Sequence, residues 1–311
     1  MPVSIIMRPD VEPMSWDEFC RSTGPYAIAV DGFVGEGPRY DPHGPRLNLN
    51  HHQGVDRLAT RATCAQALIK VRMGLFFERF RDADGPRADL YENDCDEDVC
   101  GTNLVLMHHD LSCSTSNPAL NRLIGLIDAL DTTAGAYPFV PDMTALRELA
   151  WIFQPFRLFR VSGGLDRRRA DDFQGITTDV MHRMMEYVTG RGKQIALDTR
   201  YTRIGGGPRW TMIREVGENG RVGAFGDGIK AYVVVRDRGG DRFTYTIGRV
   251  SEFIPFPVPE LLALLDAAEG DGARHWGGGD TIGGSPRATG SRLDPATVEG
   301  IINRYLVSLP A

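Results

Sequence analysis

The sequence lacks any hydrophobic run close to the roughly 20 residues that a membrane-spanning helix needs, so we expect the protein not to enter a membrane. Its first stretch, MPVSIIMRPDVEPMSW, contains acids and prolines where a signal peptide would have a basic start and an apolar core. Cysteine is also sparse: the five cysteines are an odd, scattered set without a CxxC pair. Such a set favours free thiols over a disulfide framework and gives no zinc signature. We therefore predict a cytoplasmic protein.

Basic residues are fewer than acidic ones: the sequence has 35 lysines and arginines and 41 aspartates and glutamates, which gives a net charge of −6. Long duplex DNA requires many basic contacts to its phosphates, so this balance argues against such a partner. It leaves room for a small phosphorylated substrate or a short oligonucleotide. A carboxylate cluster that holds divalent cations would itself add negative charge without repelling a phosphate.

Strand and helix patterns alternate in the first two thirds of the chain. The apolar run PYAIAVDGFV (25–34) predicts a buried strand, and LNLNHH (47–52) predicts a second one. Apolar residues at helical spacing in 60–80 and 117–131 predict helices. Alternation of this kind is typical of α/β layers built on a mostly parallel sheet.

The pattern changes near residue 195. The segments from 210 to 250 are rich in β-forming residues and are joined by glycine and aspartate turns. A helix, a glycine-rich stretch (273–293) and a last helix (295–309) follow. We therefore predict an α/β domain in residues 1–194, with a mostly parallel sheet flanked by helices, and a smaller α+β C-terminal domain in residues 195–311.

Two adjacent histidines, His51 and His52, end the second predicted strand. A solvated turn would explain them, and so would a metal site, because imidazole is a common metal ligand. Asp31 poses the same choice, since a single acid at the end of a strand is more often a turn residue than a ligand. Asp128 and Asp131 share one face of a predicted helix, which usually means a polar surface stripe. In this apolar stretch, however, a buried carboxylate would need a partner.

The acid-rich segment ENDCDEDVCGT (92–102) stands directly before a predicted helix. Acids at the start of a helix meet its exposed amides and the positive end of its dipole, so capping accounts for one or two of them. Five acids within seven residues repel one another unless a cation is present. Sets of carboxylates suit Mg²⁺ or Mn²⁺, and we favour metal binding over capping alone.

These segments resemble the motifs of the DHH phosphoesterase superfamily, which includes RecJ-type exonucleases, oligoribonucleases, cyclic-dinucleotide phosphodiesterases and family II inorganic pyrophosphatases. The family's acid-rich motif, H-x-x-P-D-x-D-a-x-G-S, aligns with ENDCDEDVCGT and places Asp96 and Asp98 at its two metal carboxylates. Asp31 in IAVDG matches a second motif, an aspartate at the end of a strand.

Three further segments extend this resemblance over most of the chain. Asn50-His51-His52 matches the D-H-H motif, and Asp131-Thr132 matches an Asp-Thr pair that closes a helix. The segment GGSPRATG (283–290) is similar to G-G-G-H-x-x-A-x-G, the glycine-rich substrate loop of the family's C-terminal domain.

Three residues and the motif order depart from the family pattern. Glu92 replaces the first-motif histidine, Asn50 replaces the DHH aspartate, and Ser285 replaces the histidine of the glycine loop. The acid-rich motif also follows the histidine pair instead of preceding it. The run VDGFVGEGPRYDPHGPRLNLNHHQ resembles the VD…YDP…DHHQ run of the melanocyte-proliferating-gene family, a nuclease-like relative. A rearranged core is physically tolerable, because ligands can converge at strand ends whatever the connectivity.

The resemblance implies a two-metal centre with Mn²⁺, or alternatively Mg²⁺, that hydrolyses a phosphate ester or anhydride. The implied metal ligands are Asp31, His51, Asp96, Asp98 and Asp131, with Glu92 or Asp94 in place of the missing histidine. The implied catalytic residues are His52 and Arg287, which would contact the phosphate. The implied substrate-binding residues are Gly283, Gly284, Ser285, Arg287 and Gly290.

The expected substrate is a small nucleotide, a dinucleotide or an oligonucleotide end. The departures from the family pattern motivate an alternative, which is a catalytically degenerate DHH-like protein that binds a nucleotide or a metal for regulation. A structural metalloprotein is a third interpretation.

Overall fold

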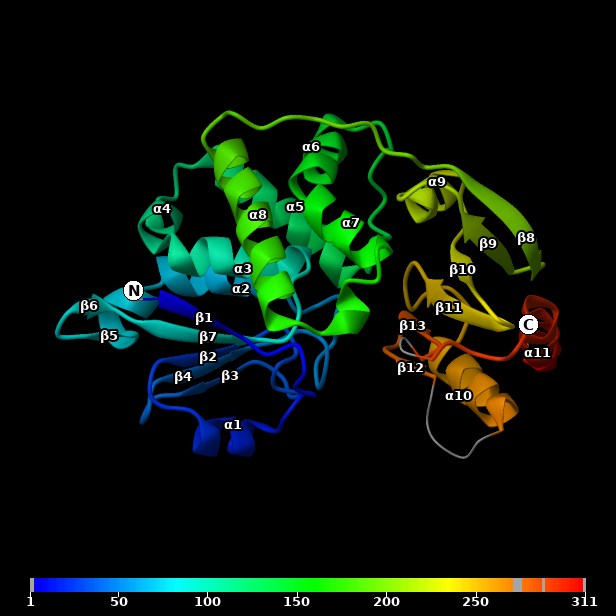
Figure 1. Ribbon diagram of the computed structural model, residues 1–311, viewed down its shortest axis with the longest axis horizontal. Helices are drawn as coiled ribbons and strands as arrows, with labels where there is room; N and C mark the ends of the chain where they lie inside the picture. The colour runs from blue at the N-terminus through cyan, green and yellow to red at the C-terminus, as the bar shows by residue number, and fades with distance from the viewer. Residues whose placement is uncertain (1–2, 271–275, 287–288, 310–311) are drawn as a thin grey trace. The chain divides into compact units, whose positions relative to one another are not determined.

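The computed structural model describes residues 3–270, 276–286 and 289–309, apart from the side chain of Asp166. The chain divides into two compact units (Figure 1). Unit 1 consists of Met1–Thr132 and Arg147–Ile195, and unit 2 consists of Thr133–Leu146 and Ala196–Ala311. Each unit combines helices with a sheet, so the chain is an α/β protein. Within the described ranges, no helix has both the length and the apolar character needed to cross a membrane.

Unit 1 is built on a sheet with the strand order β1-β7-β2-β4-β3. Its strands are β1 (Val3–Met7), β2 (Ala27–Val30), β3 (Arg39–Asp41), β4 (Arg46–Leu49) and β7 (Ala88–Glu92). The first four strands in this order run parallel, whereas β3 pairs antiparallel with β4 at the edge. β2 has the apolar sequence AIAV and is buried throughout. Because they are parallel, β2, β4 and β7 bring their C-terminal ends to the same edge of the sheet, where α/β proteins usually bind ligands.

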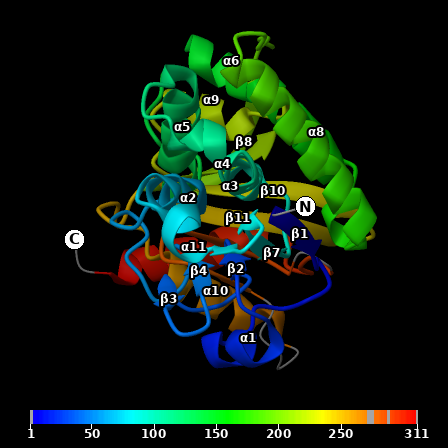
Figure 2. The same cartoon turned by 90° about the vertical axis from the view of Figure 1, so that its left-hand side faces the viewer.

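Helices cover both faces of this sheet, with α1 on one face and α2 and α3 on the other (Figures 1 and 2). The helices of unit 1 and its border are α1 (Trp16–Ser22), α2 (Thr63–Arg72), α3 (Glu97–Met107), α4 (His109–Cys113), α5 (Pro118–Thr132), α6 (Thr144–Ile152), α7 (Gln154–Val161) and α8 (Ala170–Val188). A π-helical turn (Leu75–Arg79), a 3₁₀ turn (Leu165–Arg167) and a small ribbon of β5 (Arg81–Asp82) and β6 (Gly85–Pro86) complete the unit.

Three helices of unit 1 approach one another at Gly101 on α3. A Cβ atom at this position would lie 3.0 Å from the Cβ of Cys64 on α2 and 3.2 Å from the Cδ1 of Ile127 on α5. Both distances are shorter than ordinary contacts between packed carbon atoms. The absence of a side chain at Gly101 therefore permits the observed spacing of α2, α3 and α5.

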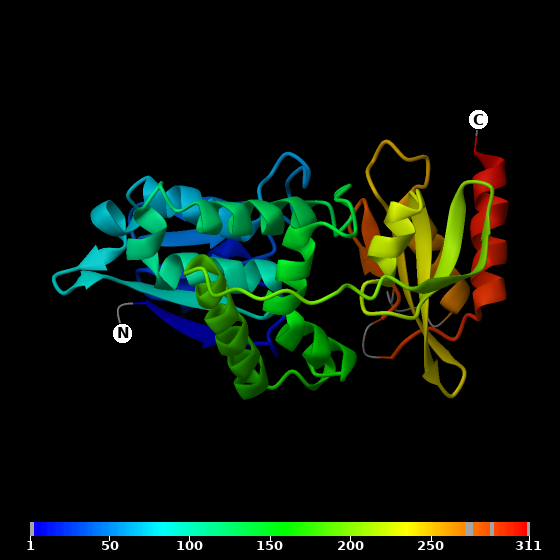
Figure 3. The ribbon, with the colours of Figure 1, turned by 90° about the horizontal axis from the view of Figure 1, so that it is seen from above.

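Unit 2 is built on a mixed sheet with the order β12-β13-β11-β10-β9-β8. Its elements are β8 (Tyr201–Gly207), β9 (Trp210–Glu215), α9 (Gly220–Gly226), β10 (Ala231–Gly239), β11 (Arg242–Arg249), α10 (Val258–Glu269), β12 (Gly277–Gly278), β13 (Ile282–Gly284) and α11 (Pro295–Ser308). α10 and α11 cover one face of this sheet and α9 covers the other (Figure 3). Tyr245 and Val233 belong to the larger core, in which they pack with residues such as Leu261 and Ile302.

Candidate metal centre

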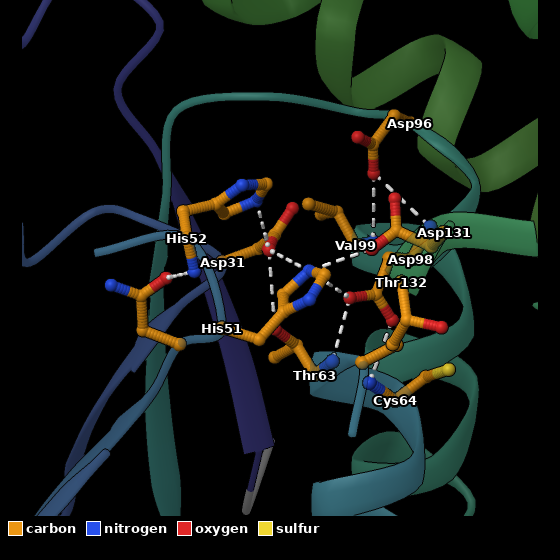
Figure 4. A network of polar contacts seen from close by, with 12 residues as sticks. Asp31, His51, His52, Thr63, Cys64, Asp96, Asp98, Val99, Asp131 and Thr132 are labelled. Carbon is orange, nitrogen blue, oxygen red and sulfur yellow. Dashed lines mark hydrogen bonds and ion pairs between the residues drawn. The ribbon is translucent and has the colours of Figure 1, made fainter. Parts of the chain in front are cut away.

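The centre of the candidate site is the imidazole of His51, two residues beyond the end of β4. Its Nε2 atom lies 2.6 Å from Oδ2 of Asp131, 3.4 Å from Oδ1 of Asp31 and 3.6 Å from Oδ2 of Asp98. These three carboxylates come from the end of α5, the end of β2 and the first turn of α3 (Figure 4). Segments that are distant in the sequence thus place acidic side chains around one buried nitrogen.

The close approach of His51 to Asp131 has the distance of an ion pair but is not among the hydrogen bonds of the described residues. Among the described residues, neither Nε2 nor Nδ1 of His51 has a hydrogen-bond partner, and neither does Oδ2 of Asp131. Buried polar atoms in proteins are nearly always paired, so this group of atoms requires an explanation. A cation coordinated by these atoms would satisfy an imidazole nitrogen and carboxylate oxygens together.

The donor atoms fall into two groups, and within each group the atoms lie within 4.8 Å of one another. One group contains Asp31, His51 and His52, and the other contains His51, Asp98 and Asp131. His51 belongs to both. Burial opposes a charge on its ring, but the adjacent carboxylates of Asp131 and Asp31 outweigh this effect and raise the pKa of His51 to about 10. The ring therefore lies in a strongly negative environment that favours a positive charge.

Asp31 is held in place at the end of β2 by an unusual backbone conformation and by side-chain contacts. Its φ angle is +45°, in the left-handed region that aspartate tolerates better than most residues. Its Oδ1 atom lies 2.8 Å from Nε2 of His52 and accepts a hydrogen bond of 3.2 Å from the hydroxyl of Thr63. Burial alone would raise the pKa of Asp31, but the adjacent imidazoles of His52 and His51 hold it well below its usual range.

Asp98 joins the cluster to the N-terminus of α2. Its two oxygens accept hydrogen bonds from the backbone N–H groups of Thr63, at 2.6 Å, and Cys64, at 2.7 Å. α2 needs these acceptors because its N-cap residue, Ala62, has no side chain that could serve. Burial and the nearby carboxylates of Asp31 and Asp131 nevertheless raise the pKa of Asp98 to about 7. The cluster thus carries more negative charge than its own donors neutralise.

Asp96 is also the N-cap of α3. Its Oδ1 atom accepts hydrogen bonds from the N–H groups of Asp98, at 3.1 Å, and Val99, at 3.0 Å. Burial and the charge of Asp31 raise its pKa well above the usual range. Asp96 is drawn with the same network in Figure 4, but neither group of close donor atoms includes it. Capping therefore explains this residue at least in part.

The structure does not bring Glu92 or Asp94 into either donor group, which differs from the prediction that one of them replaces the missing histidine. Alternation along β7 places Glu92 on the buried face of the strand, and its Oε2 atom accepts a 2.9 Å hydrogen bond from Nδ2 of Asn103 on α3. Asp94 accepts a 2.7 Å hydrogen bond from the N–H group of Cys95 in the turn before α3.

Glu92 leads to a prediction about stability and pH. Burial raises the pKa of Glu92 to about 8, against an ordinary value of 4.5. When Glu92 is protonated, its carboxyl group gains an O–H that can donate a hydrogen bond. Among the described residues, Oε1 of Glu92 and Oδ1 of Asn103 have no hydrogen-bond partner. Protonated Glu92 therefore contributes to the free energy of unfolding. This contribution is fully present below pH 4.5 and is lost as the pH rises through 8.

We therefore expect Glu92→Gln to leave stability unchanged near pH 4 and to raise it by roughly 3–5 kcal/mol near pH 9. Urea unfolding across this pH range would measure the difference between the variant and the wild type. Glu78→Gln, on an exposed turn, is the control and should show no such trend. A constant difference between wild type and Glu92→Gln at all pH values would show that Glu92 does not change its protonation state.

Asn50, which the resemblance aligns with the aspartate of D-H-H, has its side chain engaged in hydrogen bonds with the surrounding chain. Its Nδ2 atom donates to the carbonyls of Val34, at 3.1 Å, and Glu36, at 2.8 Å, and to Oε1 of Gln53, at 2.9 Å. Its Oδ1 atom accepts a 2.9 Å hydrogen bond from the N–H group of His52. Only an amide can donate and accept in this way, so Asn50 fixes the turn that carries both histidines.

Asn50→Asp is expected to lower the free energy of unfolding by roughly 2–4 kcal/mol, because a buried carboxylate would face carbonyl oxygens in place of donating to them. Chemical denaturation of the metal-free protein would measure the loss. Unchanged stability together with an additional ion per chain would instead indicate that the position can act as a ligand.

Two residues were predicted to contact the phosphate, His52 and Arg287. His52 lies at the solvent-exposed edge of the cluster, and Arg287 lies outside the described residues. Gly283 and Gly284 belong to β13, which pairs with β11 on one side and β12 on the other. A Cβ at Gly284 would meet the backbone oxygen of Tyr245 at 2.2 Å, so glycine here serves strand packing.

Gly283 and Gly284 therefore lie in a strand that is paired at both edges and not in an open loop, and their contact with a substrate stays a prediction. Ser285 continues the same pairing: it is buried and accepts a 2.9 Å hydrogen bond from the N–H group of Tyr245. Gly290 lies beyond the strand with a φ angle of +64°, and its N–H group donates to the carbonyl of Pro286.

Comparison with known proteins adds no identification: no protein-family model matches the sequence, and the search of curated proteins gives no match.

Proposed function

We propose that this chain is a metal-dependent phosphoesterase of DHH type that hydrolyses a phosphate ester or anhydride, in a small nucleotide, a dinucleotide or an oligonucleotide end. One observation carries the proposal. Three carboxylates from separate elements surround Nε2 of His51, and the shortest of these contacts, 2.6 Å, is not a hydrogen bond. Imidazole and carboxylate donors in this combination suit Mn²⁺, with Mg²⁺ as the alternative.

The residues that would hold an ion are His51, Asp31, Asp98 and Asp131. Both capping bonds of Asp96 use Oδ1, so its Oδ2 atom is the one that could reach an ion. A bound divalent ion, or a pair of them, would polarise the phosphoryl oxygens and activate a water molecule as the nucleophile. The two donor groups share His51, and one imidazole nitrogen binds a single ion, so a pair of ions would have to be bridged by a carboxylate.

Other groups of the site would hold the metal ligands and the substrate in position. Amides of α2 fix both oxygens of Asp98, and Thr63 fixes Asp31. His52, whose side chain is 30% exposed, would orient the phosphate or the leaving group from the solvent-exposed edge. Such prior positioning is a large part of how metal sites promote hydrolysis.

A second function, metal or nucleotide binding without turnover, is favoured by the setting of Asn50. Its amide is committed to the turn that carries the histidines, so the site has one carboxylate fewer than the D-H-H pattern implies. A site with fewer ligands could retain binding and lose the chemistry.

Metal analysis combined with a substrate panel would separate these functions. Protein stripped with a chelator would be reloaded with Mn²⁺ or Mg²⁺, and the ions per chain would be counted. It would then be assayed with bis-p-nitrophenyl phosphate, pyrophosphate, a linear dinucleotide and a short oligonucleotide. We expect Mn²⁺ binding and Mn²⁺-dependent hydrolysis of at least one of them. Bound Mn²⁺ without hydrolysis of any probe would favour the binding protein, and absence of ion binding would contradict both.

A further inference from the structure

The cluster around His51 is buried on one side and partly exposed to solvent on the other, which we call its rim. The side chains of His51, Asp98 and Asp31 are only 0%, 0% and 3% exposed. Three side chains at the rim are considerably more exposed: His52 at 30%, Arg57 at 24% and Asp131 at 22%. An incoming ligand would therefore meet the rim residues first, and two of these three can carry positive charge.

Arg57 lies beside a proposed metal ligand and has hydrogen-bonding capacity to spare. Its Nη2 atom donates a 2.9 Å hydrogen bond to the backbone carbonyl of Asp131 and lies 3.6 Å from Oδ2 of the same residue. The longer of these distances exceeds that of a direct hydrogen bond. Among the described residues, the buried Nε atom of Arg57 has no hydrogen-bond partner. The Nε atom is buried, so an incoming anion would meet the exposed part of this guanidinium, whose side chain is 24% exposed.

The turn that carries Arg57 is itself well ordered by local hydrogen bonds. Oδ1 of Asp56 accepts from the N–H groups of Leu58, at 3.0 Å, and Ala59, at 3.2 Å. The N–H group of Thr60 donates to the carbonyl of Asp56 at 2.9 Å. The guanidinium is thus presented from a fixed backbone, which reduces the entropy lost when it binds a ligand.

We propose that Arg57 is the phosphate-binding residue of this site, and that it selects substrates with an accessible phosphoryl group at the rim beside Asp131. The inference rests on the proposed function. Guanidinium donors match phosphate oxygens in a bidentate arrangement, which an ammonium group cannot reproduce. Arg61, four residues further on, provides a contrast: it is 61% exposed and paired at 2.9 Å with Asp128, which is outside both donor groups.

Titration of the full chain would test this proposal with three variants, Arg57→Gln, Arg57→Lys and Arg61→Gln. Calorimetry would first measure the affinity of each for Mn²⁺, and then the affinity of the Mn²⁺-loaded protein for inorganic phosphate. We expect Arg57→Gln to weaken phosphate binding by about 10–100-fold, the usual worth of a charge-assisted hydrogen bond. Arg57→Lys should fall between this variant and the wild type, and Arg61→Gln should match the wild type.

The measurements separate the inference from the function on which it rests. If Arg57→Gln loses Mn²⁺ affinity but, once loaded, binds phosphate like the wild type, then Arg57 only positions Asp131 and the inference is wrong. Equal loss in Arg57→Gln and Arg61→Gln would also contradict it, because general surface charge would then explain the effect. If the wild type binds no Mn²⁺, the proposed function fails, and phosphate binding to metal-free protein would still decide the role of Arg57.

Discussion

His51→Ala is expected to lower the affinity for Mn²⁺ by more than about 100-fold, since even partners outside the first shell of a metal site contribute 10–100-fold. It should abolish metal-dependent hydrolysis. The physical reason is that His51 is the residue that both donor groups share, so its loss removes a ligand from each of them. Metal titration followed by calorimetry, with activity measured on the best substrate of the panel, would quantify both effects.

The control for this prediction is His182→Ala, since His182 is an exposed residue in the middle of α8. It should leave metal binding and hydrolysis unchanged. Thermal unfolding of the metal-free proteins would show whether His51→Ala still folds. A folded His51→Ala protein that binds Mn²⁺ like the wild type would overturn the assignment of the site.

Asp98→Asn is expected to change both stability and metal binding. A carboxamide has one oxygen, so it can accept from only one of the two N–H groups at the start of α2, and its own amino group would face the other. Thr63 and Cys64 are both fully buried, and water cannot replace the lost acceptor. We expect the free energy of unfolding to fall by roughly 2–4 kcal/mol, and Mn²⁺ affinity to fall by at least about 100-fold.

Asp128→Asn is the control for Asp98→Asn, because Asp128 also binds the start of α2 but belongs to neither donor group. Oδ1 of Asp128 accepts a 2.7 Å hydrogen bond from the N–H group of Ala62, at the same helix start, while Oδ2 contacts the exposed Arg61. An asparagine can keep the first of these bonds, so the expected loss of stability is below about 1 kcal/mol. Metal affinity should not change. If both variants bind Mn²⁺ as the wild type does, Asp98 is a cap and not a ligand.

The strand-end part of the site was predictable because its signal is local. The apolar run 25–34 contains β2, which is followed directly by Asp31, and the run 47–52 contains most of β4 and, after Asn50, the histidine pair. A buried parallel strand is recognisable from its apolar residues, and parallel strands bring their ends together. The α/β class of the chain is confirmed for the same reason, since it depends on this alternation of patterns.

The acid-rich segment was harder to interpret because capping residues and metal ligands have the same preferences at a helix start. Asp96 caps its own helix, whereas Asp98 caps a different helix, α2, and joins the donor cluster. No local pattern distinguishes these roles, since the second depends on how α2 packs against α3. The setting of Glu92 was equally hard to foresee, because its partner Asn103 is supplied by tertiary structure.

Arg57 was missed altogether, the role of Thr63 within ATC (62–64) was not foreseen, and the glycine segment was taken for a loop. Each of these two residues contributes through a contact with a residue far along the chain. Glycines favour open loops, but they also permit close approach of strands, which is their role at Gly283 and Gly284. Composition alone does not distinguish these two uses.

Gly101 has a consequence for how this site can change through mutation. It supplies no donor atom, yet it sets the distance between α2, which holds Asp98, and α5, which carries Asp131. An added methyl group at Gly101 would push α2 and α5 away from α3. If the proposed ion binds here, the spacing of its ligands would then change although every ligand residue remained in the sequence.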